Sequence, residues 1–370
     1  MKTEHSKRCL AAALVAIFSA ALAAAQTPKM ANAGVQQRSA ANGLESAFRT
    51  IVGSQSTAAW IGYAVPMASG DHEICCHDSW NDGDSGRSCG ECRLEAGDDM
   101  NIGSKGLEAD LEASQTLLVF FRVENHTAEK VRIFSEDCQI NAGGRTVYWL
   151  TEVRPAESVA LLASLATDTG GGLVNADDRD QVSDGAVAAI AMHAGTSADR
   201  ALDGFVAAGQ PDKLREHAAF WLGSARGRAG FQTLQRLARE DRDDSFREKL
   251  MFDLSISKEP EAVDAIIASA RNDPSSRVRG QALFWLSQKA GKKAASAITE
   301  AIENDPETEV KKRAVFALSQ LPKDQGVPLL IQTARTNSNP AVRRQAMFWL
   351  GQSNDPRALE FFEQVLGEKN

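Results

Sequence analysis

A motif that recurs every 32 residues constrains this chain more than any other feature of its sequence. The clear copies begin at Leu214, Phe246, Val278, Val310 and Val342 and read LREHAAFWLG, FREKLMFDLS, VRGQALFWLS, VKKRAVFALS and VRRQAMFWLG. A weaker copy, VSDGAVAAIA, begins at Val182. A fixed period of this size is typical of stacked supersecondary units, none of which can bury its apolar face alone. The sequence therefore predicts a repeat architecture over residues 182–370.

Each unit has the pattern of two helices. Apolar residues stand mainly at positions 1, 5, 8 and 9, counted from the first residue of each copy, which is the spacing of one helix face. A second apolar helix is expected later in the unit, at a column formed by Leu202, Leu234, Ile266, Ile298, Leu330 and Phe362. We predict a mainly α fold, whose C-terminal part is an α-solenoid of about six two-helix repeats.

The repeats also resemble a known family. The pattern Asp-Pro-x-x-x-Val-Arg-x-x-Ala-x-x-x-Leu-Gly, clearest over residues 273–351, resembles HEAT-like repeats of the phycobilisome-lyase type. The Phe-Trp-Leu variant, which starts at Phe220, Phe284 and Phe348, is similar to exported bacterial HEAT-repeat proteins. This resemblance covers about half of the chain. It implies a solenoid and little about chemistry, because one fold serves many functions.

The N-terminal half has a different pattern. Residues 48–166 predict a small β-rich domain that contains cysteines, with strands over 59–67, 116–123, 130–134 and 146–153. A helix is expected from Pro155, because proline suits the first helical turn. Residues 26–47 and the Gly/Asp-rich residues 167–181 are interpreted as linkers.

Residues 1–25 have the pattern of a secretory signal peptide. Lys2, Lys7 and Arg8 precede an apolar run, and small residues that end at Ala25 form a cleavage site. The apolar run is short for a membrane span, so we expect no integral span after cleavage. We expect an exported protein, periplasmic or extracellular.

The charge balance disfavours one class of partner. The formal net charge is −8, and without the leader it is about −10. Nonspecific binding of nucleic acid depends on neutralisation of phosphates by Lys and Arg. We therefore expect protein partners and no nucleic acid.

Five cysteines remain after removal of the leader, and all precede the repeats: Cys75, Cys76, Cys89, Cys92 and Cys138. In an oxidising compartment they are disulfide candidates, and their odd number leaves at least one unpaired within a monomer. A tetrahedral zinc site from Cys75, Cys76, Cys89, Cys92 and the histidines His72 and His77 is the alternative. Adjacent cysteines do not easily ligate one ion, which favours disulfides. A redox dithiol is a third interpretation, but it lacks the βαβ context.

No catalytic constellation emerges from the sequence. Gly83-Asp84-Ser85-Gly86 is similar to the nucleophile segment of chymotrypsin-like proteases, but the N-terminal domain is too short for a double-barrel protease. Gly86-Arg87-Ser88-Cys89-Gly90 fits the hydrolase pattern G-x-S-x-G, but it stands in a loop without the strand and helix that position such a serine. A likeness to deoxyhypusine hydroxylase would require His-Glu pairs on repeat helices, and His193 and His217 do not precede glutamate. We therefore expect no enzyme activity and no cofactor, apart from the zinc alternative at the cysteine cluster.

Two columns of side chains could carry binding. The basic column is Arg215, Arg247, Arg279, Lys311 and Arg343, and it shares its period with an acidic or amide column at Asp241, Asp273, Asp305 and Asn337. Pairing between repeats and an anion-binding groove are both consistent with this pattern. The phenylalanine column is Phe220, Phe252, Phe284, Phe316 and Phe348, which either packs between repeats or forms a ridge for a partner.

The sequence therefore predicts an exported, noncatalytic scaffold for protein–protein interaction. Its candidate binding residues lie on the central repeats and are Phe252, Phe284, Phe316, Arg247, Arg279 and Lys311. The alternative is a metal-dependent or redox envelope enzyme centred on the cysteine cluster.

Overall fold

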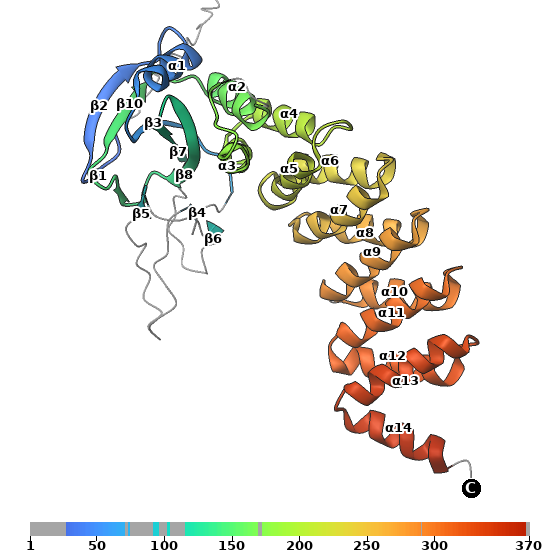
Figure 1. Cartoon of the computed structure of the whole chain (residues 1–370). Helices are drawn as coiled ribbons and strands as arrows, with labels where there is room; N and C mark the ends of the chain where they lie inside the picture. Colours follow the sequence, from blue (N-terminus) through green and yellow to red (C-terminus); the bar gives the residue numbers. More distant parts are fainter. Residues whose placement is uncertain are drawn as a thin grey trace, which may run out of the picture.

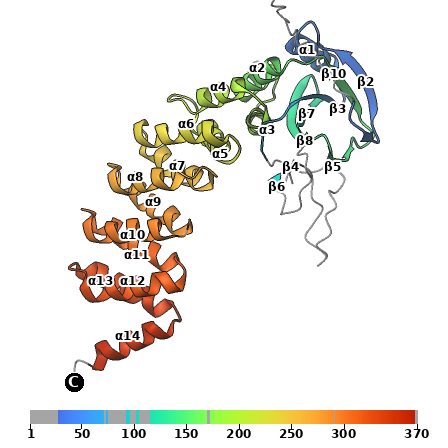
Figure 2. The ribbon, with the colours of Figure 1, turned by 180° about the vertical axis from the view of Figure 1, so that it is seen from behind.

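The computed structural model describes residues 27–70, 73–74, 92–95, 102–103, 115–168, 172–289 and 291–367. A β-rich N-terminal part is followed by a long series of helices that leads away from it (Figures 1 and 2). The mainly α fold with a C-terminal solenoid is confirmed. The predicted signal peptide lies outside the described residues, as do Cys75, Cys76 and Cys89.

The N-terminal part is built around one five-stranded sheet with the order β2-β10-β3-β7-β8. Its strands are β2 (Gly34–Ser39), β3 (Ala59–Pro66), β7 (Thr116–Glu124), β8 (Thr127–Ser135) and β10 (Thr146–Thr151). Five short strands form two smaller sheets: β1 (Met30–Ala31), β4 (Glu73–Ile74), β5 (Cys92–Arg93), β6 (Ile102–Gly103) and β9 (Ile140–Asn141). Strands β7 and β8 form the expected antiparallel hairpin.

Both faces of this sheet are covered, which explains why β7 is apolar along most of its length. Leu117, Val119 and Phe121 pack into the main core, shared with helices α1 (Leu44–Ser54) and α2 (Pro155–Ala166). On the other face, Leu118 and Phe120 pack into a smaller cluster. A strand buried on both faces has a continuous apolar run in place of an alternating pattern.

The structure corrects the interpretation of residues 26–47 as a linker. Residues 34–39 form β2, which pairs in parallel with β10, and α1 begins at Leu44. Every residue of β2 is exposed, and its sequence GVQQRS carries no apolar face. An edge strand without an apolar face has no periodic signal in the sequence.

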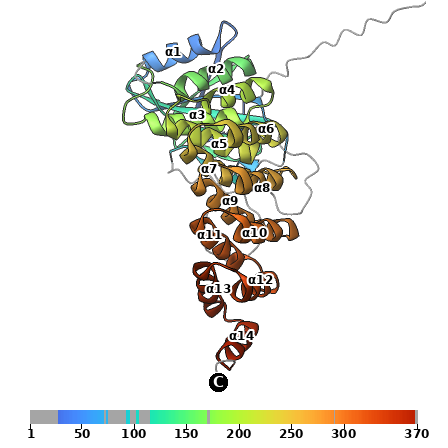
Figure 3. The same cartoon turned by 90° about the vertical axis from the view of Figure 1, so that its right-hand side faces the viewer.

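The solenoid consists of six helix pairs. The first helices are α3 (Arg179–Met192), α5 (Asp212–Ala225), α7 (Asp244–Ile256), α9 (Ser276–Gln288), α11 (Thr308–Gln320) and α13 (Pro340–Gln352). The second helices are α4 (Thr196–Phe205), α6 (Gly227–Glu240), α8 (Ala262–Asn272), α10 (Lys292–Asn304), α12 (Lys323–Thr336) and α14 (Pro356–Gly367). Figure 3 shows α7, α11 and α13 along one side of the solenoid and α8, α10 and α12 along the other.

The solenoid begins directly against the sheet. Helix α3 packs on β8 at Gly185, where an added Cβ atom would lie 2.5 Å from the carbonyl oxygen of Val131. Only glycine permits so close an approach of helix and strand backbones. One apolar core therefore extends from the sheet into the first repeats.

No helix within the described residues is both long and apolar enough to cross a membrane.

Candidate functional site

Aromatic rings form a continuous row along the first helices of the last five repeats. We call this row the aromatic ladder, and its members are Phe220, Trp221, Phe252, Phe284, Trp285, Phe316, Phe348 and Trp349. Each ring contacts the next, within a helix or across to the following repeat. The ladder therefore follows the solenoid axis from α5 to α13.

The ladder repeats over two structural units. The rings of Phe284 and Phe316 are stacked, with centroids 6.3 Å apart and planes 2° apart, and Phe316 then contacts Trp349 at 5.0 Å. Phe220 and Phe252 form the equivalent stack one double unit earlier, with centroids 6.3 Å and planes 16° apart. Tryptophan at position 8 of alternate copies sets this double period.

The phenylalanine side chains both pack between repeats and remain accessible to a partner. Its rings contact one another between repeats, as packing requires. They are also accessible, since Phe252 is 36% exposed, Phe348 is 55% exposed, and the other three are half-buried. Exposed aromatic rings in a row are suited to contact a partner, because aromatic side chains dominate interface energetics.

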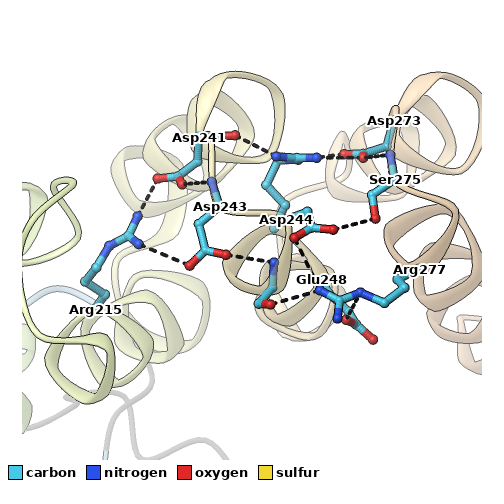
Figure 4. Close-up of polar contacts among 10 residues, drawn as sticks. Arg215, Asp241, Asp243, Asp244, Glu248, Asp273, Ser275 and Arg277 are labelled. Atoms are coloured by element: carbon cyan, nitrogen blue, oxygen red, sulfur yellow. Dashed lines mark hydrogen bonds and ion pairs between the residues drawn. The ribbon is translucent and has the colours of Figure 1, made fainter.

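The basic column has a structural role in its first three members. Arg247 and Arg279 were candidate binding residues, but both are buried and hold ion pairs within the solenoid. The Nε atom of Arg247 lies 2.8 Å from Asp273 Oδ2, and the Nε atom of Arg279 lies 2.7 Å from Asp305 Oδ2. Arg215 pairs in the same way with Asp241 (Figure 4). These arginines are enclosed by their own repeats and unavailable to a partner.

The column changes in the last two repeats. Lys311 donates to the carbonyl oxygen of Glu303, and Arg343 donates to the carbonyl oxygens of Asn337 and Ser338. Asn337 occupies the place of the paired aspartates. Among the described residues, Lys311 and Arg343 have no carboxylate partner.

A buried acid lies next to the ladder, and it was not among the predicted site residues. Asp253 occupies position 8, where Trp221 and Trp285 stand in the neighbouring repeats, and it is only 5% exposed. Burial, together with the negative charge of Glu216, raises the pKa of Asp253 to about 8. Asp253 is therefore mostly protonated at neutral pH. The sequence does contain a signal for Asp253, because this acidic residue stands at a position that holds tryptophan or alanine in the other clear copies.

A buried chain of hydrogen bonds joins the sheet to the solenoid. The Tyr63 hydroxyl lies 2.6 Å from Ser158 Oγ, which lies 2.7 Å from His193 Nε2. All three side chains are buried, and burial lowers the pKa of His193 to about 4. These residue types occur in hydrolases, but here they are enclosed in the core without access for a substrate. The chain tethers β3, α2 and the end of α3.

The cysteine cluster is described only in part. Cys92 and Cys138 lie in the smaller core cluster on the outer face of the sheet, and both are buried. The sulfur of Cys138 lies 3.0 Å from the carbonyl oxygen of Ile74, the residue before Cys75. Of the zinc candidates, only Cys92 is among the described residues, and those residues contain no group of three or more potential ligands for a metal ion.

The last repeats of the solenoid match a known protein family. The family of HEAT repeats matches residues 295–370. No curated protein matches the chain. Human deoxyhypusine hydroxylase is 15% identical, over 57% of this chain and 90% of that one, with a TM-score of 0.28.

Two further solved structures are similar to the solenoid. The CpcE–CpcF complex of phycocyanin lyase from a Nostoc species is 22% identical, over 42% of this chain and 99% of that one, with a TM-score of 0.32. The condensin Cnd3–Cnd2 subcomplex of S. pombe is 16% identical, over 57% and 31% of the two chains, with a TM-score of 0.34. The family match shows HEAT repeats over residues 295–370, and the helix pairs that precede them have the same two-helix form.

Proposed function

We propose that this chain is an exported, noncatalytic scaffold for protein–protein interaction, and that the aromatic ladder is its binding surface. The observation that carries the proposal is the row of accessible rings across five successive repeats. A solenoid presents such a row as one long surface, because each repeat adds a similar unit with a small rotation. Phenylalanine and tryptophan contribute large contact areas at little cost in conformational entropy.

Photo-crosslinking tests this proposal directly. A photoreactive amino acid is placed at Phe252 or Phe348, which lie on the ladder, or at the control position Leu359, which is 62% exposed on α14. We expect the two ladder positions to crosslink to the same protein, identified by mass spectrometry, and the control position to give none of that product. Equal crosslinking at Leu359, or none at the ladder, would exclude the ladder as the binding surface.

The variant Phe348→Ala separates binding from folding. More than half of this side chain is exposed, so its truncation is expected to change the free energy of unfolding by less than about 1 kcal/mol. The same variant is expected to weaken binding of the crosslinked protein. A drop of several kcal/mol in urea unfolding would instead show that Phe348 acts by packing.

The proposal also includes export of the protein and disulfide bonds in its β-rich part. Support for export comes from the pattern of residues 1–25. Support for disulfides comes from Cys138, which carries a disulfide and lies beside the chain that leads to Cys75. Adding reductant to the full chain is expected to lower the free energy of unfolding of the β-rich part by about 2–4 kcal/mol for each bond broken. The measurement is urea unfolding followed by tryptophan fluorescence, and an unchanged curve or stoichiometric zinc would contradict the disulfide interpretation.

A further inference from the structure

Successive first helices meet through side chains at positions 3 and 4 of the repeated motif. At the contact between α3 and α5, position 3 is Asp184 and position 4 is His217, with Asp184 Oδ1 and His217 Nδ1 3.2 Å apart. At the next contact, Glu216 at position 3 pairs with Lys249 at position 4. In the N-terminal repeats, an acidic residue on one helix therefore faces a basic residue on the following helix.

The contact between α9 and α11 keeps the base and lacks the acid. Position 4 is Arg313, whereas position 3 is Gly280. The Arg313 side chain lies across this glycine, because a Cβ atom added to Gly280 would lie 2.5 Å from Arg313 Cδ and 2.8 Å from its Nη1. Arg313 is exposed, and among the described residues it has neither an ion-pair nor a hydrogen-bond partner. At the contact between α7 and α9, position 4 is the neutral Gln281, and Glu248 at position 3 pairs with Arg277 of α9 instead. The fold thus seats a guanidinium where the first two contacts hold a paired acid and base.

This guanidinium borders the best-aligned rings of the aromatic ladder. Residues three or four apart on a helix are surface neighbours, so Arg313 adjoins Phe316 and Gly280 adjoins Phe284. These two phenylalanine rings form the stack with planes 2° apart. An unpaired cation and an accessible aromatic stack therefore lie side by side.

Several cations of α11 and α13 have no carboxylate partner among the described residues. Lys311 and Arg343 lack carboxylate partners among the described residues, and exposed Arg344 likewise forms no described ion pair. Lys312 is the exception, because it pairs with Glu309 of its own helix at 3.0 Å. In a chain with a net charge of −8, Arg313 and Arg344 are both exposed without a described ion pair, which makes this part of α11 and α13 complementary to an acidic ligand.

We propose that an extended acidic peptide segment of a partner protein binds across α9 and α11, with a carboxylate on Arg313 and an aromatic side chain on the rings of Phe284 and Phe316. The ligand carboxylate takes the place that Glu216 holds opposite Lys249. A guanidinium can bind a carboxylate through two parallel hydrogen bonds, which adds orientation to charge. This inference rests on the proposed function and specifies the chemistry of the partner.

The test measures binding of a synthetic peptide to the full chain by fluorescence anisotropy. The probe is a short labelled peptide of alternating Glu and Phe, compared with peptides of the same length that alternate Lys and Phe or Glu and Ser. We expect the Glu/Phe peptide to bind most tightly and its affinity to fall as salt increases, because exposed ion pairs are screened. Tighter binding of the Lys/Phe peptide, or of a short oligonucleotide, would overturn the assignment of an acidic peptide.

Three variants locate the site. Arg313→Ala is expected to weaken binding of the Glu/Phe peptide about tenfold, since a central interface arginine contributes more than about 1 kcal/mol. Lys249→Ala is the matched control at the same motif position, and it should leave the affinity unchanged. Gly280→Glu supplies the missing acid within the protein and should also weaken binding, because the flexible end of Arg313 can move to pair with it.

The outcomes distinguish this inference from the proposed function. If Arg313→Ala and Lys249→Ala bind the peptide with the same affinity as the unmodified chain, the acidic-peptide inference is wrong. If crosslinks at Phe252 and Phe348 persist in that case, the ladder remains the binding surface for a partner of different chemistry. If those crosslinks are absent as well, both proposals fail. Circular dichroism spectra of the variants confirm that each one retains its helices.

Discussion

Replacing Arg247 with alanine is expected to lower the free energy of unfolding by about 3–5 kcal/mol, because it leaves a buried carboxylate without its partner. Two nitrogen atoms of Arg247 donate to the carboxylate of Asp273, at 2.8 and 2.9 Å. The third nitrogen donates to the carbonyl oxygen of Asp241 at 2.7 Å. One side chain thus connects the loop before its own helix to the loop at the end of its own repeat.

Two control variants identify the cause of this loss. Arg271 and Glu300 form an ion pair between two repeats, but both are exposed, so Arg271→Ala should cost less than about 1 kcal/mol. The double variant Arg247→Met with Asp273→Leu removes both charges and should recover most of the stability lost in Arg247→Ala. Urea unfolding followed by circular dichroism measures all three. A small loss in Arg247→Ala would show that the buried pair contributes little to the stability of the solenoid.

The aspartate of each pair has a second task that explains its recurrence. Asp273 Oδ1 accepts a hydrogen bond from the backbone nitrogen of Ser275 at 2.8 Å, and Asp305 Oδ1 accepts one from Glu307 at 2.8 Å. Each carboxylate therefore closes the turn before the next repeat while it binds the arginine. Asn337 can perform the first task, since it accepts from Asn339 at 2.9 Å, but it carries no charge for Lys311. At the C-terminal end the solenoid therefore keeps this turn without the buried ion pair of the earlier repeats.

The helix pairs were predictable because each helix buries one face, and that face recurs with the period of the helix. Strands β3, β7, β8 and β10 were predictable from their apolar runs. Strand β2 was missed because none of its residues is buried. The shared period of Arg247 and Asp273 indicated pairing between repeats, whereas the structure places the pair within one repeat and encloses it.

The placement of Arg313 over Gly280 was beyond the sequence pattern. Whether position 4 of one helix meets position 3 of the preceding helix depends on how the two helices cross, and a single-helix pattern carries no information on crossing. The same limit applies to the ladder. The phenylalanine column was visible in the sequence, whereas the stack of Phe284 on Phe316 and the contact of Phe316 with Trp349 depend on the spacing of helices.

Replacing Asp253 with asparagine is expected to stabilise the protein at pH 7 by about 4 kcal/mol, and to have almost no effect near pH 4. Asp253 is buried, and no described side chain donates a hydrogen bond to its carboxylate. Burial and the charge of Glu216 raise its pKa to about 8 in the folded state. In the unfolded chain the pKa returns to about 3.9, the ordinary value for aspartic acid.

The sign of the pH effect follows from these two pKa values. Between about pH 4 and pH 8 the folded state keeps the proton and the unfolded state has released it, so stability falls as pH rises through this range. Below the unfolded pKa both states are protonated, and the penalty is absent. Asparagine has a similar size and does not titrate, so its advantage over aspartic acid should grow with pH and level off above about pH 8.

The difference between the two proteins is the quantity to measure, because another group titrates in the opposite direction. Burial lowers the pKa of His193 to about 4 in the folded state. As pH falls below about 6.5, the unfolded chain protonates this histidine before the folded state does, so the stability of the folded state decreases. That contribution is the same in both proteins and cancels in the difference of their urea unfolding free energies. A difference that does not change between pH 4 and pH 8 would show that Asp253 is ionised in the folded solenoid. Its carboxylate would then need a charged or hydrogen-bonding partner in the aromatic ladder, where position 8 otherwise packs tryptophan or alanine.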